Sequence, residues 1–116
     1  MIHIQFYLLF SLPMIPVDKH RICYYEGALN ENVQVKTTGF KQIRQILQQK
    51  QSLLAGLPVS YSKQAHLIHV LIKPANTSQY TDLVAILDEM LILKIDYYAI
   101  TDPDTDEMRR IAPKVH

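Results

Sequence analysis

The sequence predicts an α/β (α+β) fold of one domain, residues 1–116, with two helices packed on one face of a mixed four- to five-stranded sheet. Three observations predict this two-layer sandwich: short apolar runs rich in β-branched and aromatic residues, two longer segments with apolar residues at helical spacing, and the chain order β-β-α-β-α-β. A chain of 116 residues is long enough to bury one core without disulfides or metals.

Composition narrows the function classes. The chain is 48% hydrophobic and 20% charged, as is usual for a globular protein, and its net charge of +1 gives no basic stripe of the kind that nucleic-acid binders carry. The charge is uneven: residues 1–66 contain seven Lys or Arg against three Asp or Glu, a net of +4, and residues 67–116 contain five against eight, a net of −3. This pattern indicates either a chance excess with an acidic tail or two faces of opposite potential that steer association.

The first residues leave two interpretations open. Ile2–Val17 is strongly apolar, but Pro13 and Pro16 interrupt it, and the run Phe6–Leu12 is far shorter than the ~20 residues that a membrane helix needs. The segment also lacks the basic leader and small-residue cleavage site of a signal peptide. Residues 1–11 are therefore either an extra strand or the remnant of a membrane segment.

The next segment favours a β-hairpin over residues 12–26, with Asp18–Arg21 as its turn and Ile22–Tyr25 as its second strand. Cys23 lies in that strand, and we expect it to be a small buried hydrophobe. As a lone cysteine it excludes an internal disulfide. Val33–Lys36 is too short to assign.

A first helix is predicted from Gly39 to Leu54. Its apolar residues fall on one face and its lysine, arginine and glutamine side chains mostly on the other. Thr37 and Thr38 offer hydroxyl groups for its N-cap, and Gly56 lies just past its end. Residues 57–65 read as a linker.

The stretch from His66 to Asp102 predicts a right-handed βαβ unit. Leu67–Ile72 resembles a strand covered on both faces, and Lys73-Pro74 ends it because proline lacks the N–H that a sheet needs. Asn76 is placed as an N-cap, with Gln79 three residues later.

The helix of this unit is predicted to begin at Tyr80, with Thr81, Asp82, Asp88 and Glu89 on its polar face. Ile95–Thr101 then forms the second strand. One of its two neighbouring tyrosines, Tyr97 and Tyr98, is expected in the core and the other on the surface.

No catalytic constellation is found, and we expect a protein that is not an enzyme and has no cofactor. Three glycines leave no room for a phosphate-binding loop. His66 and His69 would point to opposite faces of a strand, which argues against a metal pair. The acidic run Asp102–Glu107 resembles a calcium loop, but Glu107 stands where glycine is needed and Pro113 where the bidentate glutamate should be.

The acidic run more simply predicts the start of a short helical turn, because carboxylates stabilise the positive end of a helix. That turn would lie within Met108–Val115. The neighbouring pair Asp88-Glu89 reads as a solvated helix face. No residue is therefore assigned to catalysis, to a metal or to a cofactor.

Several motifs together resemble one known family. They are Val70-Leu-Ile-Lys-Pro74, Tyr80-Thr-Asp-Leu-Val84, Ile86-Leu-Asp-Glu-Met90 and Tyr98-Ala-Ile-Thr-Asp102, with Cys23–Gly27 and Lys36–Thr38 adding to the set. The sequence resembles the ExbD/TolR family of biopolymer transport proteins, in particular the branch of Bacteroidetes-type bacteria, over roughly residues 12–107. The residues that carry the family signature are Lys73, Pro74, Tyr80, Leu87, Asp88, Glu89 and Met90.

The resemblance implies a periplasmic domain associated with the inner membrane, dimeric and without catalysis of its own. Such domains work with ExbB-like and TonB-like partners, and peptidoglycan is a further candidate partner. The aspartate that handles protons in the family belongs to a membrane helix that this sequence lacks, so proton coupling is assigned to no residue here. Lys94 stands where many relatives have glycine.

The interface is predicted on the last strand, at Ile95, Tyr97, Tyr98 and Ile100, because an exposed strand can pair with another chain. An alternative function is a small-molecule-sensing module of the ferredoxin-like or ACT kind, whose β-α-β-β-α-β order is close to the predicted one. A zinc or calcium protein is a third, weaker reading.

Overall fold

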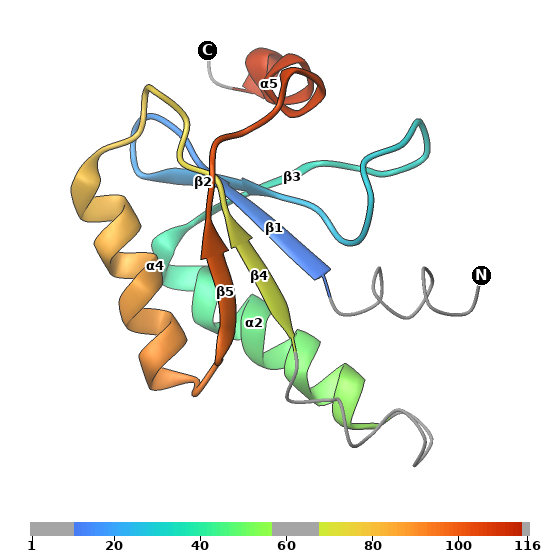
Figure 1. Cartoon of the computed structure of the whole chain (residues 1–116), viewed down its shortest axis with the longest axis vertical. Coiled ribbons are helices and arrows are strands. Elements are labelled where there is room, and N and C mark those ends of the chain that lie inside the picture. The colour runs from blue at the N-terminus through green and yellow to red at the C-terminus, as the bar shows by residue number, and fades with distance from the viewer. Residues whose placement is uncertain (1–10, 57–67, 115–116) are drawn as a thin grey trace.

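The computed structural model describes residues 11–56 and 68–114. Within these ranges, five strands and three α-helices follow one another (Figure 1). In order they are β1 (Ser11–Pro16), β2 (Arg21–Tyr24), β3 (Lys36–Gly39), α2 (Phe40–Ala55), β4 (His69–Ile72), α4 (Tyr80–Ile92), β5 (Tyr97–Ile100) and α5 (Thr105–Ile111), followed by a 3₁₀ turn at Ala112–Lys114.

The strands form one mixed sheet in the order β3-β2-β1-β4-β5. The three strands on one side, β3, β2 and β1, are antiparallel neighbours, whereas β1, β4 and β5 run parallel. The register pairs Met14 with Tyr24 and with Ile72, which fixes which side chains share a face. β3 and β5 are the two edges of the sheet among the described strands.

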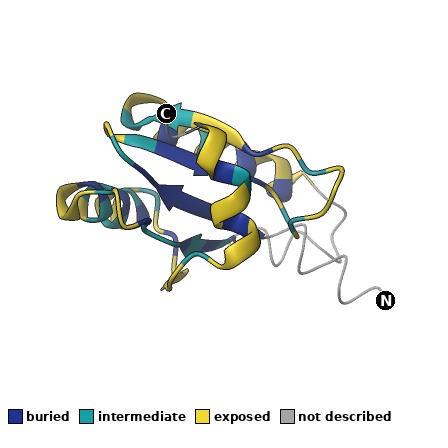
Figure 2. Cartoon of the chain, turned by 90° about the horizontal axis from the view of Figure 1, so that it is seen from above, coloured by how far each residue is buried: buried dark blue, intermediate teal, exposed yellow. Residues whose placement is uncertain are grey.

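Helices α2 and α4 cover one face of the sheet and confirm the predicted two-layer arrangement (Figure 1). The core between the layers takes alternate residues of the central strands and the inward stripe of each helix, as the two periodicities require. Its fully buried members include Leu12, Met14, Ile22, Ile43, Leu47, Val70, Ile72, Ile86 and Met90. Figure 2 shows this buried layer, with exposed residues on the outer sides of the helices.

The hairpin of β1 and β2 is confirmed, and its turn lies where the polar residues predicted it. Arg21 N–H donates to the Asp18 carbonyl at 3.1 Å, and both central residues, Lys19 and His20, have positive φ angles of 55° and 57°. Positive φ at both positions is what a type I′ turn requires, and this turn matches the twist of the flanking strands. Cys23 is fully buried in β2, as predicted.

The end of α4 forms a Schellman motif. Ile95 N–H donates to the Met90 carbonyl at 2.8 Å, and Lys94 N–H donates to the Leu91 carbonyl at 3.2 Å. Lys94 has a φ of 57°, in the left-handed region that usually favours glycine. The side chains of Ile95 and Met90 are both buried, as the hydrophobic contact of this motif requires.

A second, smaller core lies on the opposite face of the sheet. Ile15 and Cys23, which point away from α2 and α4, join Val35, Ala75 and Ile111 there. Ile111 belongs to α5, so this helix packs against part of the face that the two longer helices leave open. Figure 1 shows α5 near the ends of the strands. The predicted single turn within Met108–Val115 is in fact a helix that begins three residues earlier, at Thr105.

The predicted N-cap of the first helix is wrong. Thr37 and Thr38 lie in β3, paired with Cys23 and Ile22, and α2 begins after Gly39 with no side-chain cap. The third strand, which was not assigned, forms because these β-branched residues pair with β2 across an edge. The chain order is therefore β-β-β-α-β-α-β-α rather than β-β-α-β-α-β.

The N-cap of α4 is Gln79 rather than Asn76. Gln79 N–H donates to the Asp82 side chain at 3.4 Å. Asp82 was placed on the polar face, but it is only 3% exposed, because it also binds the His20 ring at 2.7 Å. This contact ties the β1–β2 turn to the start of α4, over a separation of 62 residues that no local pattern reveals.

Candidate binding interface

β5 is an unpaired edge of the sheet. Among the described strands it pairs only with β4, in parallel, with Tyr98 beside Val70 and Ile100 beside Ile72. Thr101 N–H donates to the Ile72 carbonyl at 3.0 Å. Because successive N–H groups of a strand point to opposite sides, the N–H groups of Tyr98 and Ile100 face the open edge.

The four side chains of β5 are all exposed, although the strand is apolar. Tyr97 is 47% exposed, Tyr98 45% and Ile100 52%. The prediction of one core tyrosine and one surface tyrosine is therefore wrong, because neither face of β5 is fully covered. An apolar strand with free backbone donors is a template for pairing with another strand.

The side chains of β5 divide between the two faces. Tyr98 and Ile100 share the face of Val70 and Ile72, where α2 and α4 pack, and Tyr97 shares the opposite face with its neighbour in β4. On that opposite face the rings of His69 and Tyr97 lie 5.2 Å apart at an angle of 60°. A hollow of about 250 Å³ lies beside them, with Asp96, Tyr98 and Ala99 among its walls.

α4 extends the apolar surface of β5. Tyr80, Val84 and Leu91 fall on one stripe of this helix and are 78%, 37% and 77% exposed. Glu89, on another side of α4, pairs with Arg44 of α2 at 2.8 Å and 3.0 Å, so the stripe lies on the side turned away from α2. Figure 1 shows α4 at the β5 end of the sheet. We call Tyr80, Val84, Leu91, Tyr98 and Ile100 the edge patch.

One predicted interface residue is misplaced. Ile95 precedes β5, which begins at Tyr97, and is only 3% exposed, because its side chain fills the core at the end of α4. Ile95 is therefore a core residue and not an interface residue. Tyr97, Tyr98 and Ile100 all lie on the exposed strand.

The residues of the family signature have different environments. Met90 is buried and Leu87 packs against the core, whereas Tyr80 and Asp88 are exposed and Pro74 is half-buried. The paired carboxylates were expected to be a solvated face, but Glu89 is bound by Arg44. The Glu89 carboxylate raises the pKa of the Arg44 guanidinium through hydrogen bonding and charge.

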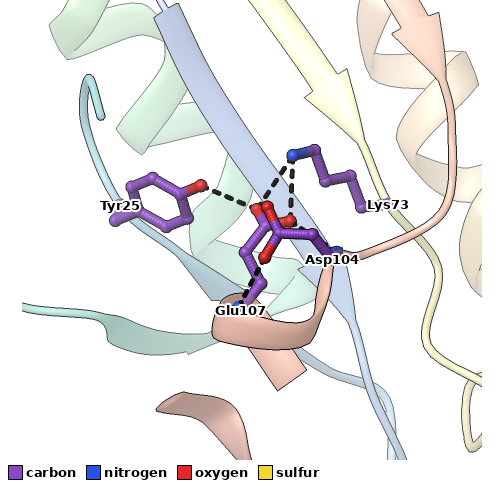
Figure 3. Close-up of polar contacts among 4 residues, drawn as sticks. All are labelled: Tyr25, Lys73, Asp104 and Glu107. Atoms are coloured by element: carbon purple, nitrogen blue, oxygen red, sulfur yellow. Dashed lines mark hydrogen bonds and ion pairs between the residues drawn. The ribbon is translucent and has the colours of Figure 1, made fainter. Parts of the chain in front are cut away.

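Lys73, the remaining signature residue, belongs to a buried polar cluster (Figure 3). Its Nζ lies 2.9 Å from Glu107 Oε1 and 3.0 Å from Oε2. Tyr25 donates its hydroxyl to Glu107 Oε2 at 2.7 Å, and Asp104 N–H donates to Oε1 at 2.9 Å. Burial raises the pKa of the Tyr25 phenol, and the Glu107 carboxylate raises it further.

The same cluster caps α5. Asp104 Oδ1 accepts from Glu107 N–H at 2.8 Å, so Asp104 and Glu107 form a capping box. The acidic run thus starts a helix, as predicted, but Glu107 also reaches into the sheet. Its carboxylate is satisfied by protein donors on both oxygens, so the cluster fixes α5 in place and presents no reactive group. Sequence reasoning missed it because its members are 34 and 82 residues apart.

Other predicted features are tested only in part. No group of three or more His, Cys, Asp or Glu within residues 11–56 and 68–114 is placed to hold a metal ion. Across the same ranges, no helix has the length and apolar character that crossing a membrane requires. The predictions for residues 1–10, for the linker 57–65 and for His66 lie outside the described residues.

Comparisons of the chain with protein-family models, with curated proteins and with solved structures found no match.

Proposed function

We propose that this chain is a binding domain without catalysis of its own, which acts by pairing β5 with a second copy of itself or with a strand of a partner. The observation that carries the proposal is the combination of an apolar edge strand, unpaired on one side among the described strands, with an exposed apolar stripe on the neighbouring helix. Soluble proteins usually protect such an edge with lysine, proline or a covering segment, and the four residues of β5 contain neither lysine nor proline.

A second copy fits the edge patch by symmetry. A two-fold axis at the open edge would pair β5 with its copy in antiparallel fashion, using the outward N–H and C=O groups of Tyr98 and Ile100. The same axis would bring the Tyr80–Leu91 stripe of α4 towards its copy, because α4 lies at that end of the sheet. Backbone pairing and apolar burial would then occur in one interface.

The wider context of the proposal comes from the sequence resemblance. We propose that the domain belongs to a TonB/Tol-type complex coupled to proton-motive force, and that it lies in the periplasm beside the inner membrane with ExbB-like and TonB-like partners. The motifs between residues 70 and 102 support this assignment. The sandwich of two helices on a mixed sheet is also of the α/β kind that the resemblance implies.

The alternative sensing module receives no support from the fold. Its β-α-β-β-α-β order requires a helix between the first two strands, whereas β1 and β2 are joined by a tight turn here.

Two measurements on the purified chain test the proposal. Sedimentation equilibrium over a wide concentration range should show a reversible monomer–dimer equilibrium, and a pull-down with a TonB-like protein as bait should recover this chain. A chain that stays monomeric at the highest concentration and also fails to bind that partner would contradict the proposal.

A further inference from the structure

A second surface feature lies far from β5, at the other side of the sheet. A hollow of about 220 Å³ opens between one flank of α2 and the ends of β2 and β3. Its walls include Tyr24, Glu26, Lys36, Ile46, Lys50 and Leu53. Tyr24 and Lys36 are direct neighbours across β2 and β3, and Ile46, Lys50 and Leu53 follow one another on one side of α2.

Lys50 is unusual for its burial. Its side chain is only 5% exposed, and its Nζ donates to Glu26 Oε1 at 2.8 Å. An ammonium group has three donors, and Glu26 is its acceptor among the described residues. Buried lysines are rare unless they are paired, because the charge loses its hydration. Two N–H groups of a nearly buried cation therefore remain for a further acceptor in the hollow.

The present partner of Lys50 is easily displaced. Glu26 is 55% exposed, so its carboxylate can turn into water when another anion takes its place on the buried ammonium. Lys36 stands at the same hollow, and no carboxylate of the described residues pairs with it. The formal charges of Lys36, Lys50 and Glu26 sum to +1, which favours an anion in the hollow.

The rest of the wall is apolar. Ile46 is half-buried, and Leu53, although a large hydrophobic residue, is 59% exposed. A ligand with a negative group and a short hydrocarbon chain would cover this apolar surface while its charge met the two lysines. A hollow of about 220 Å³ accommodates only a small molecule.

We propose that this hollow binds a small carboxylate with a short apolar chain. The ligand carboxylate takes the place of Glu26 on Lys50 and also pairs with Lys36, and its chain lies against Ile46 and Leu53. Glu26 is then a competing anion built into the chain, which keeps the buried ammonium paired when no ligand is bound. This site is independent of the pairing of β5.

Hexanoate is a suitable probe, and its binding can be followed by amide chemical shifts of the full chain. We expect millimolar binding, with shifts centred on the hollow. Glu26→Gln should tighten binding severalfold, because it removes the competing charge. Lys50→Met, which keeps the apolar stem, should weaken binding by about tenfold or more. Lys41→Met, an exposed lysine of α2 that does not line the hollow, should bind as the wild type does.

Three results would overturn the proposal. The first is the absence of chemical-shift changes with hexanoate, and the second is equal binding of hexanoate by the wild type and Lys50→Met. The third is equal affinity for acetate and hexanoate, because the apolar wall would then contribute nothing. Hexylamine should not bind, since its charge is repelled. If Lys50→Met does not fold, Glu26→Gln decides the question: a variant that binds hexanoate no more tightly than the wild type would overturn the proposal.

Discussion

The ammonium of Lys73 and the carboxylate of Glu107 form an ion pair, at 2.9 Å, that joins the end of β4 to α5. The Lys73 side chain is 14% exposed and that of Glu107 is fully buried. Because both members are shielded from water, removing one leaves the other as a poorly hydrated charge. This pair therefore holds the last helix against the face of the sheet that α2 and α4 do not cover.

Replacing Glu107 with Gln should lower the free energy of unfolding by about 3 kcal/mol, since it leaves the Lys73 charge without a counterion. Urea unfolding followed by circular dichroism measures this loss. The matched control is Asp106→Asn, which removes the exposed pair with Arg109 on the same helix and should change stability by less than about 1 kcal/mol. Equal losses in both variants would show that the Glu107 cluster does not anchor α5.

Tyr25 should make stability depend on alkaline pH. Its pKa is raised in the folded chain, so above the ordinary value of 10.0 the unfolded chain releases this proton while the folded chain keeps it. The folded state then binds more protons, and the free energy of unfolding falls as pH rises, by at most ~1.4 kcal/mol per pH unit from this group. Tyr25's contribution is complete below pH 10 and is lost progressively above it.

Comparison with Tyr25→Phe isolates this effect from that of the other tyrosines. The variant should be less stable than the wild type by about 1 kcal/mol at neutral pH, because the hydrogen bond to Glu107 is lost. The difference between the two proteins should shrink above pH 10. A difference that stays constant up to the alkaline unfolding limit would contradict the assigned role of Tyr25.

Lys94→Gly should stabilise the fold. Lys94 has a φ of 57°, which costs an L-residue roughly 1 kcal/mol and costs glycine little. We expect a gain of about 0.5–1 kcal/mol in the free energy of unfolding, measured by urea titration. Lys94→Ala removes the same side chain but keeps the strain, so it should give no gain. If Lys94→Ala were also stabilising, the gain in stability would come from the loss of the lysine charge and not from relief of the backbone strain.

Leu91 and Leu53 provide a matched pair for the interface. Both are exposed leucines on helices, 77% and 59%, but only Leu91 belongs to the edge patch. Leu91→Ser should weaken self-association by about tenfold or more, because each copy loses apolar contact area, and Leu53→Ser should leave it unchanged. Sedimentation equilibrium measures both. Similar effects from the two substitutions would place the interface elsewhere.

The elements that were predicted correctly are those with a local signal. The β1–β2 hairpin, the helix after Gly39 and the unit of β4, α4 and β5 follow from periodicity and turn residues. β3 was not predicted, because two of its residues, Thr37 and Thr38, are as typical of a helix N-cap as of a strand. Only pairing with β2 decides between the two.

The misplaced polar residues share one cause. Asp82 was placed on the polar face of a helix and Glu107 only at a helix start, yet each meets a distant partner, His20 for Asp82 and Lys73 for Glu107. Long-range contacts of this kind leave no trace in local patterns. The prediction of Ile95 as an interface residue was wrong for a local reason. An apolar residue at this position fits both an exposed strand and the buried end of a helix, and the Schellman motif places it at the buried end.

The pairing of β5 is tested most directly by Ile100→Pro. The N–H of Ile100 faces the open edge, so proline removes a donor from the proposed interface while the bonds to β4 remain. Sedimentation equilibrium should show a dimer for the wild type and a monomer for a folded Ile100→Pro variant. The account is contradicted if the variant associates as tightly as the wild type, or if the wild type neither associates nor binds the proposed TonB-like partner.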